Sequence, residues 1–340
     1  MEIRIIEDKQ FWEMAIQNFE EANFLQSFNW GLFHRAMDKK VFPLALFEGE
    51  KILALFLTVK EIAKRGNYLT IAGGPLLDWH SSNAKQYLKV IFDHLKKIAK
   101  DEKCSFIRFR PQTVLSNQTV ELLRAVQAQP APMHLTADLT LQLNLNLSED
   151  ELLAQMRKNT RYEIRRAQKM GITTHLSQDA ADLEKFNELQ QYLAKKHNFI
   201  PFSNKFISEQ FKVFAADDQV VLVHSEYQGQ LLASAFVIFY HGEAVYHYGV
   251  STPQNDRLPG SYACQWAAIL EAKRRGCQKY NFWGIAPKDE VSHRFYGVSI
   301  FKRGFGGEEV QYIPAEDVAV DFKYQFTRAF ELVRKKTRRL

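Results

Sequence analysis

The order of apolar and polar segments predicts the same set of strands and helices twice along this chain. In the first half, two apolar strands flank the turn Glu48-Gly49-Glu50, which is typical of a β-hairpin. A third strand, a long amphipathic helix and a fourth strand follow. We predict these elements at residues 42–47, 51–60, 68–71, 83–100 and 105–110.

The second half repeats this order. Its hairpin turns at Tyr227-Gln228-Gly229, and we predict strands at 220–224, 231–240, 244–248 and 279–282 with a helix at 262–275 before the last strand. Upstream, Ser148 and Glu151 form a capping-box pattern that begins a basic helix at 152–169, and another helix covers 179–197. Hairpin, strand, helix and strand form the core of the GNAT acyltransferase fold. We therefore predict an α/β protein with mixed sheets, built as two tandem GNAT-like domains at 1–146 and 147–340.

Composition and charge narrow the class of protein. The chain has 340 residues, of which 46% are hydrophobic and 25% charged, as in ordinary globular domains. A net charge of +6 favours a polyanionic partner such as RNA, a pyrophosphate or an anionic membrane face. The cysteines are Cys104, Cys264 and Cys277, too widely spaced to predict a disulfide framework or a zinc site. Without a signal segment or a long apolar run, we expect a cytoplasmic protein.

The segment from Phe301 to Gly307 is the first candidate for chemistry. Lys302 and Arg303 precede four residues of which three are glycine. A cation beside accessible backbone amides suits an oxyanion or a phosphate, and glycine lets the backbone approach a ligand closely. The other interpretation is a tight turn or β-bulge whose charges are solvated.

The loop before the helix at 262–275 argues against coenzyme A. Acetyl-CoA-dependent GNAT enzymes carry R/Q-x-x-G-x-G/A here, with amides that hold a pyrophosphate. Arg257 and Gly260 fit this pattern, but Tyr262 occupies the small final position and Pro259 removes an amide donor. We therefore expect no cofactor.

Basic and aromatic residues supply further candidates. Lys158, Arg161, Arg165 and Lys169 share one helix face, either to hold a phosphate backbone or as a solvated surface. Tyr246 and Tyr248 alternate on one strand and are expected to point together, as core residues or toward a pocket. No nucleophilic triad, HExxH pattern or carboxylate cluster is present, so no metal site is predicted.

These segments together resemble the Fem family (FemABX) of non-ribosomal peptidoglycan aminoacyltransferases. The resemblance lies in Tyr280-Asn281-Phe282-Trp283-Gly284, in Phe301-Lys302, and in residues 158–167, which are similar to the family pattern K-x-T-R-Y-N-I-R-x-A. It implies transfer of an amino acid from aminoacyl-tRNA to an amine of a cell-wall precursor, lipid II or UDP-MurNAc-pentapeptide. No long helical hairpin is inserted between Ala167 and Gln230, so the chain resembles the compact FemX type.

The resemblance also assigns residues. It implies that Lys302 stabilises the tetrahedral oxyanion and is the catalytic residue. A wider set of residues is expected to contact substrate, some implied by the resemblance and some proposed alongside it. These residues are Trp30, His34, Arg35, Arg110, Phe202, Phe206, Tyr248, Phe301 and Arg303. Contact with tRNA would involve Lys158, Arg161 and Arg165.

This sequence departs from the family pattern at several of those positions. His34 stands where relatives often have lysine, and Phe202 and Phe206 stand where some have arginine and tyrosine. Arg35 is the hypothetical substitute for that lysine. Arg108 and Arg110, on one face of a strand, are the hypothetical replacements for the cation missing at Phe202 and Phe206.

Other interpretations of the chain remain open. One is an acyl-CoA-dependent N-acyltransferase of the same fold, and the other is a non-catalytic module that binds RNA or precursor. At the C-terminus, residues 321–340 combine an apolar face of phenylalanines with many basic residues. That helix would contact RNA or the anionic inner membrane face, or pack on the body of the protein and leave a frayed basic tail.

Overall fold

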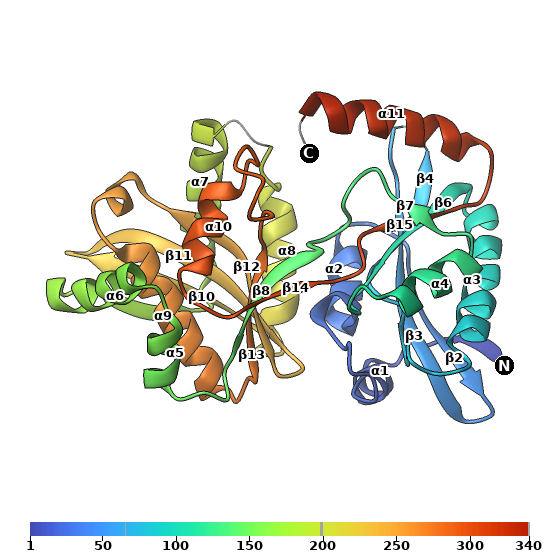
Figure 1. Ribbon diagram of the computed structural model, residues 1–340, viewed down its shortest axis with the longest axis horizontal. Coiled ribbons are helices and arrows are strands. Elements are labelled where there is room, and N and C mark those ends of the chain that lie inside the picture. Colours follow the sequence, from blue (N-terminus) through green and yellow to red (C-terminus); the bar gives the residue numbers. More distant parts are fainter. Residues whose placement is uncertain (65, 198–199, 339–340) are drawn as a thin grey trace. The chain divides into compact units, whose positions relative to one another are not determined.

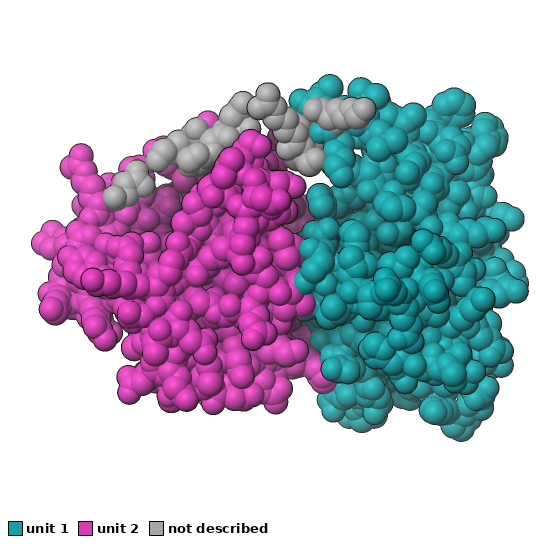
Figure 2. Space-filling view, in the orientation of Figure 1, with its two compact units in different colours: residues 1–138, 311–340 teal, residues 139–310 magenta. Residues whose placement is uncertain are grey.

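The computed structural model describes residues 1–64, 66–197 and 200–338. It divides the chain into two compact units, coloured separately in Figure 2. The first unit comprises residues 1–138 and 311–340, and the second comprises residues 139–310. Each unit is built around its own mixed β-sheet (Figure 1).

The first unit has a sheet in the order β1-β2-β3-β4-β6-β15-β7, with the short β5 paired to β3. Its strands are β1 (Glu2–Ile5), β2 (Val41–Glu48), β3 (Lys51–Glu61), β4 (Asn67–Gly73), β5 (Leu76–Leu77), β6 (Cys104–Pro111), β7 (Gln129–Pro130) and β15 (Glu316–Ala319). Its helices are α1 (Lys9–Ile16), η1 (Phe24–Gln26), α2 (Phe28–Ala36), α3 (Ala84–Asp101), α4 (Asn117–Ala125) and α11 (Lys323–Arg338).

The second unit has a sheet in the order β14-β8-β13-β12-β11-β10-β9. Its strands are β8 (Leu139–Asn144), β9 (Thr173–Ser177), β10 (Val220–Tyr227), β11 (Gln230–Tyr240), β12 (Glu243–Ser251), β13 (Lys279–Gly284) and β14 (Glu308–Gln311). Its helices are α5 (Glu149–Gln155), α6 (Lys158–Met170), α7 (Ala180–His197), α8 (Asn204–Ala215), η2 (Pro253–Asp256), α9 (Gly260–Arg274) and α10 (Tyr296–Arg303).

The predicted duplication is confirmed, since the two sheets repeat one arrangement. In each, an antiparallel meander (β2-β3-β4 or β10-β11-β12) leads through a helix (α3 or α9) to a parallel neighbour (β6 or β13). A further strand pairs antiparallel with that neighbour, β15 in the first unit and β8 in the second. The amphipathic pattern that predicted α3 places Leu88, Ile91 and Leu95 in the core of the first unit.

The units divide the chain differently from the expected boundary at 146/147. β8 lies before that boundary, but it pairs with β13 and belongs to the second unit. Residues 311–340, expected in the second domain, belong to the first unit because β15 pairs with β6. Pairing across some two hundred residues leaves no local signal in the sequence.

The basic helix predicted at 152–169 is interrupted. The Ser148–Glu151 capping box is present and begins α5, but Met156 has an extended backbone and separates α5 from α6. Met156 is buried in the core, and the backbone N–H of Arg157 donates to the carbonyl of Gly304 at 2.9 Å. Tertiary packing thus breaks a segment whose local pattern is continuous.

Candidate active site in the second unit

The two parallel strands at the centre of the second unit stop pairing before either strand ends. The last pair is Val245 with Asn281, although β12 and β13 both continue. In the first unit the equivalent pairing of β4 and β6 continues to the ends of both strands. We call the diverging segments, 246–251 of β12 and 282–284 of β13, the strand fork.

A β-bulge in β12 lies at the beginning of the strand fork. Val237 pairs with Tyr246 and Phe236 with Tyr248, so His247 is an extra residue in the register. The expectation that Tyr246 and Tyr248 point together is therefore wrong, because the bulge sends them to opposite faces of the sheet. Tyr246 packs with the core on the α9 side, and Tyr248 packs against Phe236 on the other side.

The register of β13 is also interrupted, between Asn281 and Gly284. Trp283 there has φ of 64°, a left-handed conformation that is costly for a bulky side chain. Its N–H is held by the Asn281 side chain, whose Oδ1 accepts the hydrogen bond at 2.8 Å. The rings of Trp283 and His247 meet edge to face at 5.6 Å, so the two bulges lie next to each other.

Lys302 is directed at the end of the strand fork from the last turn of α10. Its Nζ donates a hydrogen bond to the carbonyl of Gly284 at 2.8 Å and lies 5.6 Å from the ring centre of Tyr246. Lys302 is buried, and burial lowers its pKa from 10.5 to about 7. An amine that is readily protonated or neutral near pH 7 therefore lies at the fork.

Tyr246 and Gly249 are matched to each other beside Lys302. A β-carbon added to Gly249 would lie 1.7 Å from the Tyr246 hydroxyl oxygen, so only glycine leaves room for this phenol. Burial raises the pKa of Tyr246, which keeps the phenol protonated. Tyr246 was expected in the core or toward a pocket, whereas Gly249, Trp283 and Gly284 were not proposed as site residues. The one available signal was the glycine at the end of an aromatic strand.

Helix α10 is fixed to the segment after β13 by further hydrogen bonds. The Ser299 hydroxyl accepts from the N–H of Ala286 at 2.8 Å, and Arg303 donates to the Ala286 carbonyl at 2.6 Å. Arg303 also forms an ion pair with Glu309 at 2.7 Å. Phe301 packs edge to face on Tyr262. Phe301 and Arg303, expected to contact substrate, thus both make contacts that position α10.

The expected cationic loop differs from the structure in two ways. Phe301 to Arg303 are helical, and the glycines after them serve close packing. An added β-carbon would meet the Thr160 hydroxyl at Gly304, the Gln155 carbonyl at Gly306 and the Gln142 carbonyl at Gly307, all within 2.9 Å. These glycines therefore let the chain pass against α5, α6 and β8, and the interpretation as a tight turn describes them best.

The start of α9 differs from a pyrophosphate site. The Asn255 side chain accepts a hydrogen bond from the N–H of Ser261 at 2.7 Å, and so occupies an amide that a phosphate would use. Tyr262 packs against Phe301 and Phe305 beside this end of the helix. Both features agree with the expectation that coenzyme A is not bound here.

Phe202, Phe206 and Tyr248 form a cluster on the face of the sheet opposite Lys302. The phenylalanine rings stack at 4.8 Å, and Phe202 lies 5.3 Å from Tyr248. The Tyr248 hydroxyl donates to Gln210 of α8 at 3.1 Å. Phe202 is exposed, so the cluster has an accessible edge.

The basic residues along α6 differ in whether their charges are accessible to solvent. Arg161 donates to the carbonyls of Leu153 and Ala154 at 3.4 and 3.2 Å, and thereby caps the C-terminal end of α5. Lys158 and Arg165 are exposed to solvent. Of the cations expected to contact tRNA, these two therefore have accessible charge.

The residues expected to bind substrate in the first unit occupy α2 and β6. Trp30 and His34 are buried and meet edge to face at 5.0 Å, and burial lowers the pKa of His34 to about 3. Arg35 forms an ion pair with Glu7 at 2.7 Å. Arg110 is fully buried, donates to Gln112 at 3.0 Å and is covered by the ring of Tyr312.

Arg108, the other hypothetical substrate cation, has carboxylate partners within the unit. It forms ion pairs with Asp317 of β15 and Glu331 of α11, both at 2.7 Å. Tyr324 also donates to Asp317 at 3.0 Å. Arg108 thus joins α11 to the sheet and is not available to a ligand in this arrangement.

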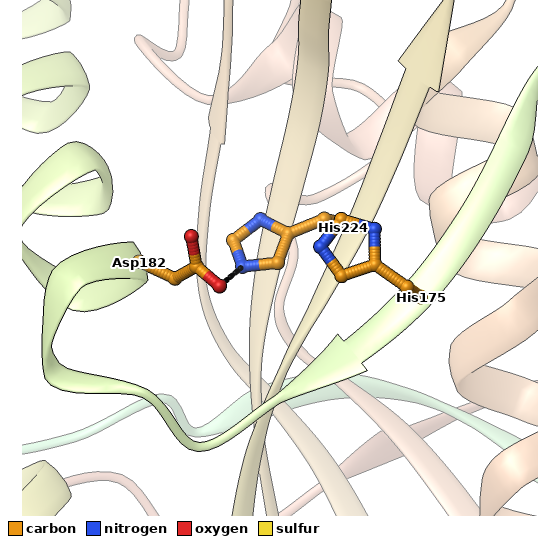
Figure 3. A group of neighbouring side chains, drawn as sticks. All are labelled: His175, Asp182 and His224. Atoms are coloured by element: carbon orange, nitrogen blue, oxygen red, sulfur yellow. Dashed lines mark ion pairs between the residues drawn. The ribbon is translucent and has the colours of Figure 1, made fainter. Parts of the chain in front are cut away.

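One group of side chains outside the strand fork has the composition of a metal site. His175 of β9, Asp182 of α7 and His224 of β10 place their nitrogen and oxygen atoms within 4.8 Å of one another (Figure 3). No metal site was predicted from the sequence. Two histidines separated by 49 positions are brought together only by strand register, since His175 lies directly opposite His224.

The comparisons of this sequence with known proteins all point to one family. The model of the FemAB family matches residues 6–228 and 219–331. The aminoacyltransferase FemA of Staphylococcus epidermidis is 30% identical over 133 residues, which cover 39% of this chain and 30% of FemA. FemA of Staphylococcus aureus is 33% identical over 92 residues, or 27% of this chain and 22% of FemA. The matched segments thus span less than a third of these relatives.

Comparison with solved structures shows the fold. A crystal structure of FemX superposes with a TM-score of 0.84 at 16% identity, covering 97% of this chain and 100% of that chain. A tandem GNAT protein from the clavulanic acid biosynthesis pathway has a TM-score of 0.59 at 9% identity, covering 94% of this chain and 99% of that chain. The prediction of two tandem GNAT-like domains is therefore confirmed.

Proposed function

The chain belongs to the FemAB family, and on that premise we propose that it is an aminoacyltransferase whose reaction takes place at the strand fork of the second unit. The observation that carries this proposal is the buried Lys302 at the end of the fork. The family match over nearly the whole chain supports the reaction class. The closed pairing of β4 and β6 supports placing the chemistry in the second unit.

The proposed donor is an aminoacyl-tRNA, and the acceptor is an amine of a peptidoglycan precursor, lipid II or UDP-MurNAc-pentapeptide. The acceptor nitrogen attacks the ester carbonyl, a C–N bond forms, and the C–O bond to the ribose breaks. The acceptor amine loses a proton and the departing ribose oxygen gains one. The ester is already activated, so the protein chiefly has to position the reactants and stabilise the oxyanion.

Lys302 fits this task as a proposed catalytic residue. In its protonated form it has three donors, one of which is directed to Gly284. The others can be directed at an oxyanion formed in the fork, where burial strengthens an electrostatic interaction. Tyr246, 5.6 Å away, shapes the site as a neutral phenol.

Exposed charge supports the polyanionic donor. Lys158 and Arg165 are accessible on α6, in the same unit as Lys302. Phosphate backbones bind such cations without sequence preference, and the binding weakens with salt. Lys158 and Arg165 are therefore our proposed tRNA contacts.

We also propose that α11 makes peripheral contact with an anionic membrane face, where a lipid-linked acceptor would reside. Within the described residues, no helix is long and apolar enough to cross a bilayer. Instead Phe322, directly before α11, and Phe326 and Val333 within it are exposed over 72%, 71% and 61% of their surfaces. Lys323 is exposed beside them, and apolar residues flanked by cations are typical of interfacial helices. The last two residues of the expected basic tail lie outside the described residues.

An aminoacyl-transfer assay tests the proposed reaction. Purified protein would be incubated with a mixture of charged tRNAs and with either lipid-linked or nucleotide-linked muropeptide, and products would be weighed by mass spectrometry. A product heavier by one amino acid supports the proposal and identifies that amino acid. Acyl transfer from a coenzyme A thioester, with none from charged tRNA, would replace it by an acyl-CoA-dependent activity.

A further inference from the structure

The cluster of His175, Asp182 and His224 lies in the second unit and is formed by three separate elements. His175 and His224 are cross-strand partners on β9 and β10, and their rings are 4.9 Å apart. Asp182 lies in the first turn of α7, which follows β9 in the chain. Its Oδ2 is 4.0 Å from Nε2 of His224, and Figure 3 shows the carboxylate facing that ring.

His224 is the member that requires an explanation. It is 1% exposed, and neither of its ring nitrogens has a hydrogen-bond partner in the part of the chain that the structure describes. A buried imidazole normally satisfies at least one nitrogen, since an unpaired polar group costs free energy.

We propose that His175, Asp182 and His224 bind a zinc ion. Two imidazoles and one carboxylate are borderline ligands that suit Zn²⁺, and three protein ligands leave a fourth tetrahedral position for water. Ligand atoms around tetrahedral zinc are roughly 3.3 Å apart, given bonds of about 2.0–2.2 Å. The ligand atoms of the three side chains already lie within 4.8 Å of one another, and bound zinc would draw them to that separation.

The two carboxylate oxygens of Asp182 have separate tasks in this arrangement. Oδ2 faces His224, whereas Oδ1 forms an ion pair with Nζ of Lys185 at 2.9 Å. A ligating carboxylate is commonly oriented by a hydrogen bond to its other oxygen, and Lys185 supplies that bond. The existing ion pair is therefore compatible with coordination through Oδ2.

Bound zinc would join an exposed edge strand to the rest of the unit. β9 is the last strand of its sheet, and most of its residues are exposed. A ligand from each of β9, β10 and α7 would fix the edge strand and the first turn of the helix together. Zinc should consequently raise the thermal stability of the unit, independently of the transfer reaction.

The test uses the full chain after treatment with a chelator. Titration with Zn²⁺ in a calorimeter should give one strong site and raise the melting temperature by a few degrees. Co²⁺ should give the visible absorption of a tetrahedral site. His175→Ala and Asp182→Asn should each abolish the cobalt spectrum and weaken zinc binding at least tenfold. Both side chains lie outside the fully buried core, so these variants should still fold.

His134→Ala is the matched control. His134 is exposed and lies 3.5 Å from Asp138, so it forms a comparable histidine–carboxylate pair outside the cluster. Zinc binding should be unchanged in this variant. The proposal would be overturned if the wild-type chain bound no zinc, or if His175→Ala and Asp182→Asn bound it as tightly as the wild-type chain does.

Discussion

The Nζ of Lys302 donates a hydrogen bond to the carbonyl of Gly284 at 2.8 Å, which ties α10 to the last residue of β13. Gly284 is the position at which β13 ends after diverging from β12. The lysine thus links two elements and places its amine at the end of the strand fork. Because Lys302 is buried, its charge should also affect the stability of the fold.

We expect Lys302→Met to stabilise the protein at neutral pH. The pKa of Lys302 falls from 10.5 to about 7 on folding, so between these values the unfolded chain binds a proton that the folded chain lacks. The resulting cost to the free energy of unfolding is fully present below the pKa of the folded chain, about 7. It disappears as pH rises to the pKa of the unfolded chain, 10.5. The advantage of the variant should be at most about 5 kcal/mol and should shrink at alkaline pH. Urea unfolding of both proteins across this pH range measures it, and a pH-independent difference would contradict the assignment.

We expect Gly249→Ala to displace Tyr246 and reduce the transfer rate. The added methyl group would lie 1.7 Å from the phenol oxygen, and relieving such overpacking costs about 1–3 kcal/mol. Gly297→Ala is the control, because nothing lies within 4 Å of its added carbon in α10. Transfer assays and thermal melts of both variants test whether Gly249 is needed to hold Tyr246 in place. Wild-type activity in Gly249→Ala would show that the transfer rate does not depend on the position of Tyr246.

We expect Gly307→Ala to destabilise the fold more than Gly171→Ala does. Both glycines have positive φ, so both substitutions incur a cost of about 1–2 kcal/mol. Only at Gly307 does the new carbon also approach a backbone atom, the Gln142 carbonyl at 2.3 Å. That clash should add about 1–3 kcal/mol. Equal unfolding free energies for the two variants would reopen the possibility that this loop is an open ligand cradle.

We expect α11, with Phe322 directly before it, to bind anionic vesicles through exposed phenylalanines. Phe322→Ser combined with Phe326→Ser should abolish sedimentation with anionic vesicles without changing the melting temperature, because both rings are largely exposed. Ile62→Ser removes an equally exposed apolar group elsewhere in the unit and is the control. Binding should weaken with salt. Equal binding by the wild-type and double-variant chains would remove α11 from the membrane contact, and binding to RNA instead would assign the helix to that partner.

Local signals in the sequence predicted the elements of each unit well. The hairpin turn at Gly49, the capping box at Ser148 and the amphipathic pattern of α3 each depend on a few neighbouring residues, and all three are present. These elements, repeated in the same order, were sufficient to predict two GNAT-like domains.

Features that depend on register were not predictable in the same way. The bulge at His247 reverses the face of Tyr248, and nothing in the local sequence identifies it. The pairing of β15 with β6 and of His175 with His224 involves residues far apart in the chain. The resemblance identified Lys302, but its burial and its bond to Gly284 follow from the tertiary structure alone.

Lys302 is proposed to stabilise the oxyanion of aminoacyl transfer. Single-turnover transfer from charged tRNA tests it most directly, with Lys302→Met compared against Lys279→Met, an exposed lysine at the start of the same strand β13. We predict that Lys302→Met slows the chemical step by about a hundredfold or more. Binding of tRNA and precursor should be retained, and Lys279→Met should transfer at the wild-type rate. Transfer by Lys302→Met at the wild-type rate would contradict this role of Lys302.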